Sequence, residues 1–190
     1  MTDPIAVLDA CVLYPAPLRD FLMHLALLDT FRARWTEEIH AEWMRNVLAN
    51  RPDLRPDQLT RTRELMNAHA RDSLVEGYES LIDLLALPDA DDRHVLAAAI
   101  HAKANAIVTF NLRDFPSENL APFGVEAIHP DEFIVSLFEA DAETVFLAAE
   151  RHRQSLKNPP KSHDEFWETL EANGLTETVK QLRSLFDRKP

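Results

Sequence analysis

The stretch at residues 88–115 constrains the fold more than any other part of the sequence, because it combines acids, an apolar segment and further polar residues in a short length of chain. The acids Asp89, Asp91 and Asp92 stand just before an alanine-rich apolar segment. Negative charge is stabilised at the start of a helix by the free N–H groups and by the helix dipole. We therefore predict a largely buried helix that begins near Asp91 or Asp92 and runs to about Lys103.

A short apolar run at residues 106–110 follows this helix and is typical of a strand in a parallel sheet that is covered on both faces. Helix and strand together form half of a β–α–β unit. In such sheets, functional groups gather at the carboxyl ends of the strands. This end carries Thr109, Asn111 and Asp114. We therefore expect Asp114 to approach the acids that precede the helix.

Two motifs stand in this stretch: D-x-x-V-L-A-A-A at residues 92–99 and T-x-N-x-x-D-F at residues 109–115. Together they resemble the second half of a PIN domain, the fold of a family of metal-dependent nucleases. The resemblance extends over about residues 5 to 135. It implies an Asp at the end of the first strand and a Glu on a later helix.

Both implied acids are present. An apolar run at residues 5–9 ends in Asp9, and the motif E-I-H-A-E-W at residues 38–43 carries Glu42 on a predicted helix that Thr36 caps. Residue type alone favours a turn cap for Asp9 and an exposed helix acid for Glu42. The resemblance assigns both to the site. Cys11 stands where the family more often has Asn. It is predicted to be a small buried thiol, because most free cysteines behave as core hydrophobes, with a reactive thiol as the alternative.

The resemblance implies that four carboxylates converge: Asp9, Glu42, Asp92 and Asp114. Their hard oxygen ligands suit Mg²⁺ or Mn²⁺. A bound cation would relieve their repulsion, polarise a phosphate oxygen and position a water for attack on a phosphodiester. Thr109 and Asn111 would orient that water, the scissile phosphate or the neighbouring carboxylates. The alternative is an acidic surface cluster without catalysis.

Other cofactors are not expected. The histidines form no Cys/His cluster and no H-E-x-x-H motif, so zinc is disfavoured and His94 is predicted to pack or to form hydrogen bonds. The three glycines Gly77, Gly124 and Gly174 cannot build a dinucleotide loop or a P-loop.

The net charge of −12 is unevenly distributed along the chain. Residues 72–150 carry sixteen acids and three bases, whereas residues 31–71 carry eight arginines and six acids. The candidate RNA-binding residues are therefore arginines on or beside the helices after Glu42: Arg45, Arg51, Arg55, Arg61 and Arg63. Solvated helix faces are the alternative, and the overall acidity argues against tight nonspecific duplex binding.

The length of 190 residues and the 46% hydrophobic content suit one well-cored domain with an appendage. We predict a PIN-like domain at residues 1–139 and a helical extension at residues 140–190. The acid near the N-terminus, the absence of an apolar run of about 20 residues and the single cysteine Cys11 predict a cytoplasmic protein without membrane association.

Further elements are predicted from periodicity and capping residues. Helices are expected at residues 17–28, 37–50, 57–71, 130–138, 141–154, 162–173 and 176–187, and strands at residues 31–35 and 125–128. The helix at residues 162–173 is predicted to open with a capping box formed by Ser162 and Glu165. The fold is therefore predicted to be α/β, a three-layer α/β/α sandwich around a mostly parallel sheet, with C-terminal helices.

The resemblance is strongest to VapC-type toxins of toxin–antitoxin systems. It implies an endoribonuclease that uses Mg²⁺ or Mn²⁺, acts on an RNA substrate and is bound by a cognate antitoxin. A homodimer is left open. The alternatives are a housekeeping RNA-processing or structure-specific nuclease and a catalytically silent binding module. A receiver-like phosphoacceptor domain would share the fold class, but no convincing Lys follows a later strand.

Overall fold

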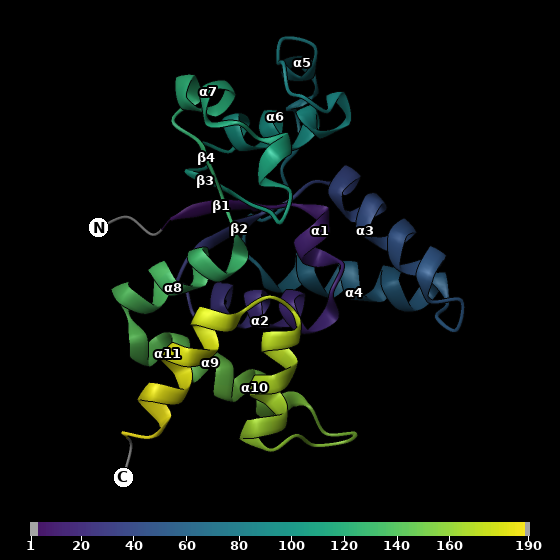
Figure 1. The fold of residues 1–190 in the computed structure, drawn as a ribbon. Coiled ribbons are helices and arrows are strands. Elements are labelled where there is room, and N and C mark those ends of the chain that lie inside the picture. The colour runs from purple at the N-terminus through teal and green to yellow at the C-terminus, as the bar shows by residue number, and fades with distance from the viewer. Residues whose placement is uncertain (1–3, 189–190) are drawn as a thin grey trace.

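The structure, a computed structural model, describes residues 4–188 and is built around a sheet of four strands. The strands are β1 (Ile5–Leu8), β2 (Arg32–Arg34), β3 (Ala106–Val108) and β4 (Glu126–Ile128). Their spatial order is β2-β1-β3-β4, and every neighbouring pair is parallel (Figure 1). This confirms the predicted α/β class, with a sheet that is parallel throughout.

Helices lie on both faces of the sheet, as a parallel sheet requires. The helices between β1 and β3 are α1 (Ala10–Leu13), α2 (Ala16–Ala26), α3 (Glu37–Asn50), α4 (Pro56–His69), α5 (Glu79–Ile82) and α6 (Arg93–His101). Those that follow are α7 (Ser117–Leu120), α8 (Pro130–Ala140), α9 (Ala142–Ser155), α10 (His163–Ala172) and α11 (Thr176–Phe186). In Figure 1, α5, α6 and α7 lie above the sheet, α2 and α8 to α11 lie below it, and α3 and α4 project to one side.

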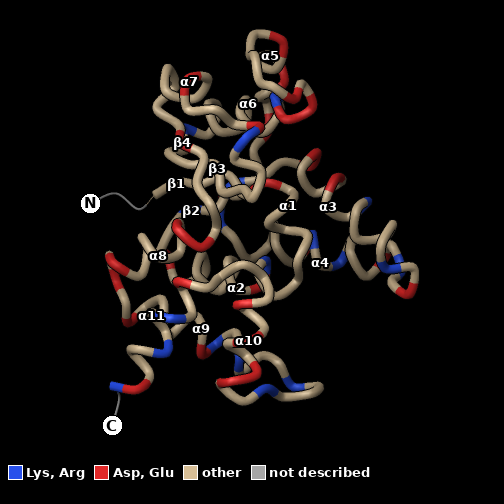
Figure 2. The backbone as a smooth tube through the Cα atoms, viewed as in Figure 1, with Lys and Arg blue, Asp and Glu red and all other residues tan. Residues whose placement is uncertain are grey.

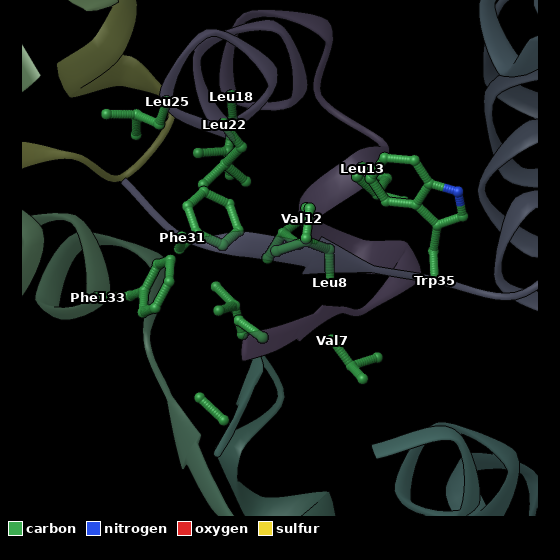
Figure 3. Close-up of a cluster of buried hydrophobic side chains, with 14 of the residues drawn as sticks. Val7, Leu8, Val12, Leu13, Leu18, Leu22, Leu25, Phe31, Trp35 and Phe133 are labelled. Atoms are coloured by element: carbon green, nitrogen blue, oxygen red, sulfur yellow. The ribbon is translucent and has the colours of Figure 1, made fainter. Parts of the chain in front are cut away.

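The central strand β1 is buried because its residues alternate between the two helical layers. Ala6, Val7 and Leu8 are all fully buried. Figure 3 shows Val7 on the opposite face of the strand from Leu8, which points into the cluster formed with Leu22 and Phe31. This burial on both faces explains why the strand has no polar residue before Asp9.

The element ends differ from the predictions where local geometry changes. The strand predicted at residues 106–110 ends at Val108. The Thr109 N–H still donates to the Ile128 carbonyl of β4, and the chain then leads into the 3₁₀ turn Leu112–Asp114. The helix predicted at residues 17–28 spans Ala16–Ala26, and Asp29 leaves it in a left-handed conformation with φ of 55°. A 3₁₀ turn, Ala90–Asp92, precedes α6, which begins at Arg93.

The C-terminal helices pack on α2 and share the hydrophobic core with the sheet. Helix α9 contacts α2 along a buried stripe that includes Val145, Ala148 and Ala149, and α8 contacts both α9 and α11. The division at residues 139 and 140 stays a prediction. Within residues 4–188, no helix is both long enough and apolar enough to span a bilayer.

Asp131 joins the first turn of α8 to the first turn of α11. Its side chain is 8% exposed and accepts hydrogen bonds from the backbone N–H groups of Glu177 (2.9 Å) and Thr178 (2.8 Å). The residue that precedes α11, Leu175, offers no capping side chain. Asp131 therefore supplies the N-terminal cap of α11 from another helix.

Replacing Asp131 with Ala is expected to lower the free energy of unfolding by about 2 kcal/mol, because two N–H groups lose a charged acceptor. Urea unfolding monitored by circular dichroism measures the change. The control is Glu132→Ala, at the next position on α8, where the side chain is exposed. Equal unfolding midpoints for the two variants would contradict the capping role.

Candidate active site

Two neighbouring strands end at the same edge of the sheet, and the residues after them meet there. Leu8 of β1 pairs with Val108 of β3, so Asp9 and Thr109 follow side by side. The Thr109 hydroxyl donates to Oδ2 of Asp9 at 2.7 Å, and the Ala10 N–H donates to Oδ1 at 2.7 Å. Asp9 is 3% exposed, so these donors hold a buried carboxylate in one orientation.

Cys11 completes this hydrogen-bond network. Its thiol donates to Oδ2 of Asp9 at 3.2 Å and lies 3.3 Å from the Thr109 hydroxyl oxygen, and its sulfur accepts from the Phe110 N–H at 3.3 Å. Burial, and then the negative charge of Asp9, raise the pKa of the Cys11 thiol to about 12. A thiol with this pKa stays protonated and unreactive near neutral pH, as predicted, although the residue is only partly buried.

A cavity of about 610 Å³ opens where α3, the segment before α6 and the segment after β3 approach one another. Six acids line it: Glu38, Glu42, Asp89, Asp91, Asp92 and Asp114. Asn111 also lines the cavity, whereas the buried Asp9 and Thr109 do not. Figure 2 shows the acidic positions of α3 and of the segment before α6 on either side of this region. The structure thus gathers Glu42, Asp92, Asp114 and Asn111 around one space.

Asp9 does not line the cavity, but its negative charge raises the pKa of acids that do. Burial raises the pKa of Asp92 to about 7, and the charges of Asp9, Asp114, Asp89 and Glu42 add to the effect in that order. Burial also raises the pKa of Glu42, with Asp9 as the largest charge contribution. Carboxylates that repel one another in this way are a favourable setting for a cation.

His94 lies between two of these acids. It is 5% exposed, with Nδ1 3.7 Å from Oε2 of Glu38 and Nε2 3.8 Å from Oε2 of Glu42. These distances are too long for hydrogen bonds, so the predicted hydrogen-bonding role is not realised and the ring packs instead. Burial lowers the pKa of His94, which favours the neutral imidazole.

Glu38 is a cavity residue that the sequence motif did not identify. It lies one helical turn before Glu42 on α3, and its Oε2 also accepts a hydrogen bond of 3.3 Å from the Tyr78 hydroxyl. The spacing of four residues between the two glutamates was the available signal, because side chains at i and i+4 share a helix face.

The oxygen-bearing side chains that line the cavity suit a hard divalent cation, but they do not surround an ion on all sides. Within residues 4–188, no group of three or more His, Cys, Asp or Glu side chains converges closely enough to hold an ion by itself. Mg²⁺ usually keeps several waters and takes only one or two carboxylates, so widely spaced acids around a cavity suit it. The carboxylates and the Asn111 amide offer oxygen ligands of the kind that Mg²⁺ and Mn²⁺ prefer.

The five predicted RNA-binding arginines occupy different environments. Arg45 lines the cavity, and Arg61 is exposed on α4 away from the cavity lining. The other three pair with nearby acids: Arg51 with Asp53 (2.6 Å), Arg55 with Asp57 (2.9 Å) and Arg63 with Glu37 (3.1 Å). The structure adds Arg93, which lines the cavity and whose Nε donates to the Ala90 carbonyl at 2.9 Å. The RNA-binding surface itself stays a prediction.

Two family models match the chain: the PIN domain at residues 5–113 and the VapC50 C-terminal domain at residues 130–184. A protein of Mycobacterium tuberculosis (strain ATCC 25618 / H37Rv), named "Putative ribonuclease VapC50", is 46% identical over 59 residues, which are 30% of this chain and 35% of that protein. The chain thus aligns with about a third of this relative's length. No solved structure matches the chain. Because the PIN domain model covers more than half of the chain and a VapC50-type C-terminal segment follows it, the chain belongs to the PIN domain family and is a VapC-type member with a C-terminal extension.

Proposed function

We propose that this protein is an endoribonuclease that depends on Mg²⁺ or Mn²⁺ and acts as the toxin of a toxin–antitoxin system. The observation that carries the proposal is the convergence of Glu42, Asp92 and Asp114 on one cavity, where burial and then the charge of Asp9 raise the pKa of Glu42 and Asp92. The similarity to a protein named as a ribonuclease supports RNA as the substrate.

The carboxylates divide into two sets by exposure. Glu42, Asp92 and Asp114 face the cavity and would contact the cation directly or through water. Asp9 is buried and accepts hydrogen bonds from the Thr109 hydroxyl and the Ala10 N–H. It would supply fixed negative charge at the base of the site. The bound cation would polarise a phosphodiester oxygen and lower the pKa of a water. Asn111 would orient that water or the phosphate.

Arg45 and Arg93 are the two arginines on the wall of this acidic cavity. They come from opposite sides, α3 and the start of α6. Guanidinium groups suit phosphate contacts because they donate paired hydrogen bonds. We infer that they place the RNA backbone against the cation, whereas Arg51 and Arg55 already bind neighbouring carboxylates.

A cognate antitoxin in the cytoplasm is the proposed protein partner. The cavity wall carries six acids and two arginines, so a basic segment of such a partner would bind there by charge complementarity. Its binding would occlude the site.

Purified protein is expected to cleave RNA in the presence of Mg²⁺ or Mn²⁺ and to stop when a chelator is added. Glu42→Gln and Asp114→Asn are each expected to slow cleavage by about tenfold or more, because each removes one anionic group from the cavity. Glu64→Gln, at an exposed position on α4, is the control and should cleave at the wild-type rate.

Folding of each variant is checked by circular dichroism. Cleavage that persists in chelator would contradict the metal mechanism. Metal binding without cleavage of any RNA would favour the silent binding module.

A further inference from the structure

The turn between α10 and α11 contacts the segment that carries the candidate active site. Phe110 stands between Thr109 and Asn111, and a Cβ atom added at Gly174 would lie 3.2 Å from Cε1 of its ring. Gly174 has a φ of 85°, the left-handed conformation in which glycine commonly ends a helix. The backbone of this turn therefore lies against the Phe110 ring, so closely that an added Cβ atom would displace the ring by a few tenths of an ångström.

The residue that caps α8 contacts the same ring from another position. The His129 ring meets Phe110 edge to face, with ring centroids 5.1 Å apart. His129 caps α8, since its Nδ1 accepts from the Asp131 N–H at 3.2 Å. Asp131 in turn caps the first turn of α11. The two contacts on Phe110 are thus connected through one residue, because Asp131 bonds His129 with its backbone N–H and the first turn of α11 with its carboxylate.

The backbone at Phe110 belongs to the hydrogen-bond network beneath the cavity. Its N–H donates to the Cys11 sulfur, and the Asn111 N–H donates to the Thr109 hydroxyl oxygen at 2.9 Å. The same hydroxyl donates to Asp9. A shift of the Phe110 ring would therefore move the groups that orient Asp9 and Asn111.

We propose that the C-terminal helices position the site, with Gly174 and Phe110 as positioning residues that hold residues 109–111 in one conformation. The helices do so by clamping the Phe110 ring between His129 and the turn at Gly174. The effect on metal binding rests on the proposed function, whereas the effect on the conformation of residues 109–111 does not.

A pair of glycine variants tests this inference. Gly174 and Gly124 both have positive φ, 85° and 67°, but a Cβ atom at Gly124 would meet nothing within 4 Å. Gly174→Ala and Gly124→Ala should each lower the melting temperature by about 2 to 4 °C through backbone strain. Only Gly174→Ala should also speed hydrogen exchange at the Asn111 amide, by about tenfold, and weaken Mn²⁺ binding by about fivefold.

The double variant Phe110→Leu/Gly174→Ala separates the ring contact from the strain. In the Phe110→Leu background the ring is absent, so adding Gly174→Ala should change neither Asn111 exchange nor Mn²⁺ affinity further. Equal Asn111 exchange in the two glycine variants, measured by nuclear magnetic resonance without metal, would overturn the inference. A wild-type protein that neither binds Mn²⁺ nor cleaves RNA would instead overturn the proposed function, and the metal-free exchange comparison would still decide this inference.

Discussion

The Asp92→Asn protein is expected to unfold at a higher temperature than the wild type when metal is absent, and yet to bind Mn²⁺ about 100-fold more weakly or worse. Both effects arise from the same carboxylate. Its burial and its acidic neighbours disfavour the charged form, and a cation needs that form. Changes in groups that only support a metal ligand already cost about 10- to 100-fold in affinity, so loss of a carboxylate that faces the cation should cost at least as much.

The stability effect depends on pH in a defined direction. The pKa of Asp92 rises from 3.8 to about 7 on folding, so between these values the native protein holds a proton that the unfolded chain has released. The stability of the metal-free wild type therefore falls as the pH rises through this window. At pH 8 the Asn variant should be more stable by about 1 kcal/mol, a figure reduced for the partial exposure of Asp92, and at pH 3 the two proteins should be equal.

Calorimetric melting at pH 3 and pH 8, together with Mn²⁺ titration between pH 6 and pH 8, measures these effects. Mn²⁺ affinity of the wild type should fall by up to about tenfold per pH unit below pH 7, because one proton competes with the ion. Asp83→Asn, at an exposed position after α5, is the control for loss of a surface charge. An Asn variant with wild-type Mn²⁺ affinity would remove Asp92 from the proposed metal site.

Thr109→Val is expected to weaken Mn²⁺ binding by about 10- to 100-fold although Thr109 is fully buried and does not line the cavity. Valine has nearly the same shape but lacks the hydroxyl that donates to Asp9 and accepts from Asn111. Loss of this hydroxyl removes the acceptor of the Asn111 N–H and leaves the buried Asp9 with only the Ala10 N–H and the Cys11 thiol as donors. The free energy of unfolding should fall by about 1–3 kcal/mol.

Thr109→Ser keeps the hydroxyl and is the matched variant. It should restore most of the Mn²⁺ affinity while losing some stability, because the buried methyl group is absent. Isothermal titration with Mn²⁺ and urea unfolding separate the two quantities. A valine variant that binds Mn²⁺ as tightly as the serine variant would show that the hydroxyl does not orient Asp9.

The sequence by itself determined where helices begin when the capping residue and its hydrogen-bond partner are close together in the chain. Thr36 caps α3 by accepting from the Ile39 N–H, and Ser162 with Glu165 forms the capping box of α10, both as predicted. Such signals are local, because a cap and its partner lie within one helical turn. The parallel sheet was also predictable, since apolar strands without alternation must be covered on both faces.

The tertiary structure alone decided how the walls of the site meet. Motifs placed Asp92 and Asp114 near each other, because a strand and the preceding helix fix their separation within one unit. Glu38, His94 and Arg93 join the cavity only because the fold brings the start of α6 to the N-terminal half of α3, and that approach depends on side chains far apart in the sequence.

The same distinction applies to the arginines and to the C-terminal helices. A run of arginines indicates positive charge, but the fold and the local turns pair Arg51, Arg55 and Arg63 with acids. The capping box predicted α10, yet only the packing of its C-terminal turn brings Gly174 against Phe110. Charge and helix propensity are properties of a segment, whereas a contact between residues 64 positions apart requires the complete core.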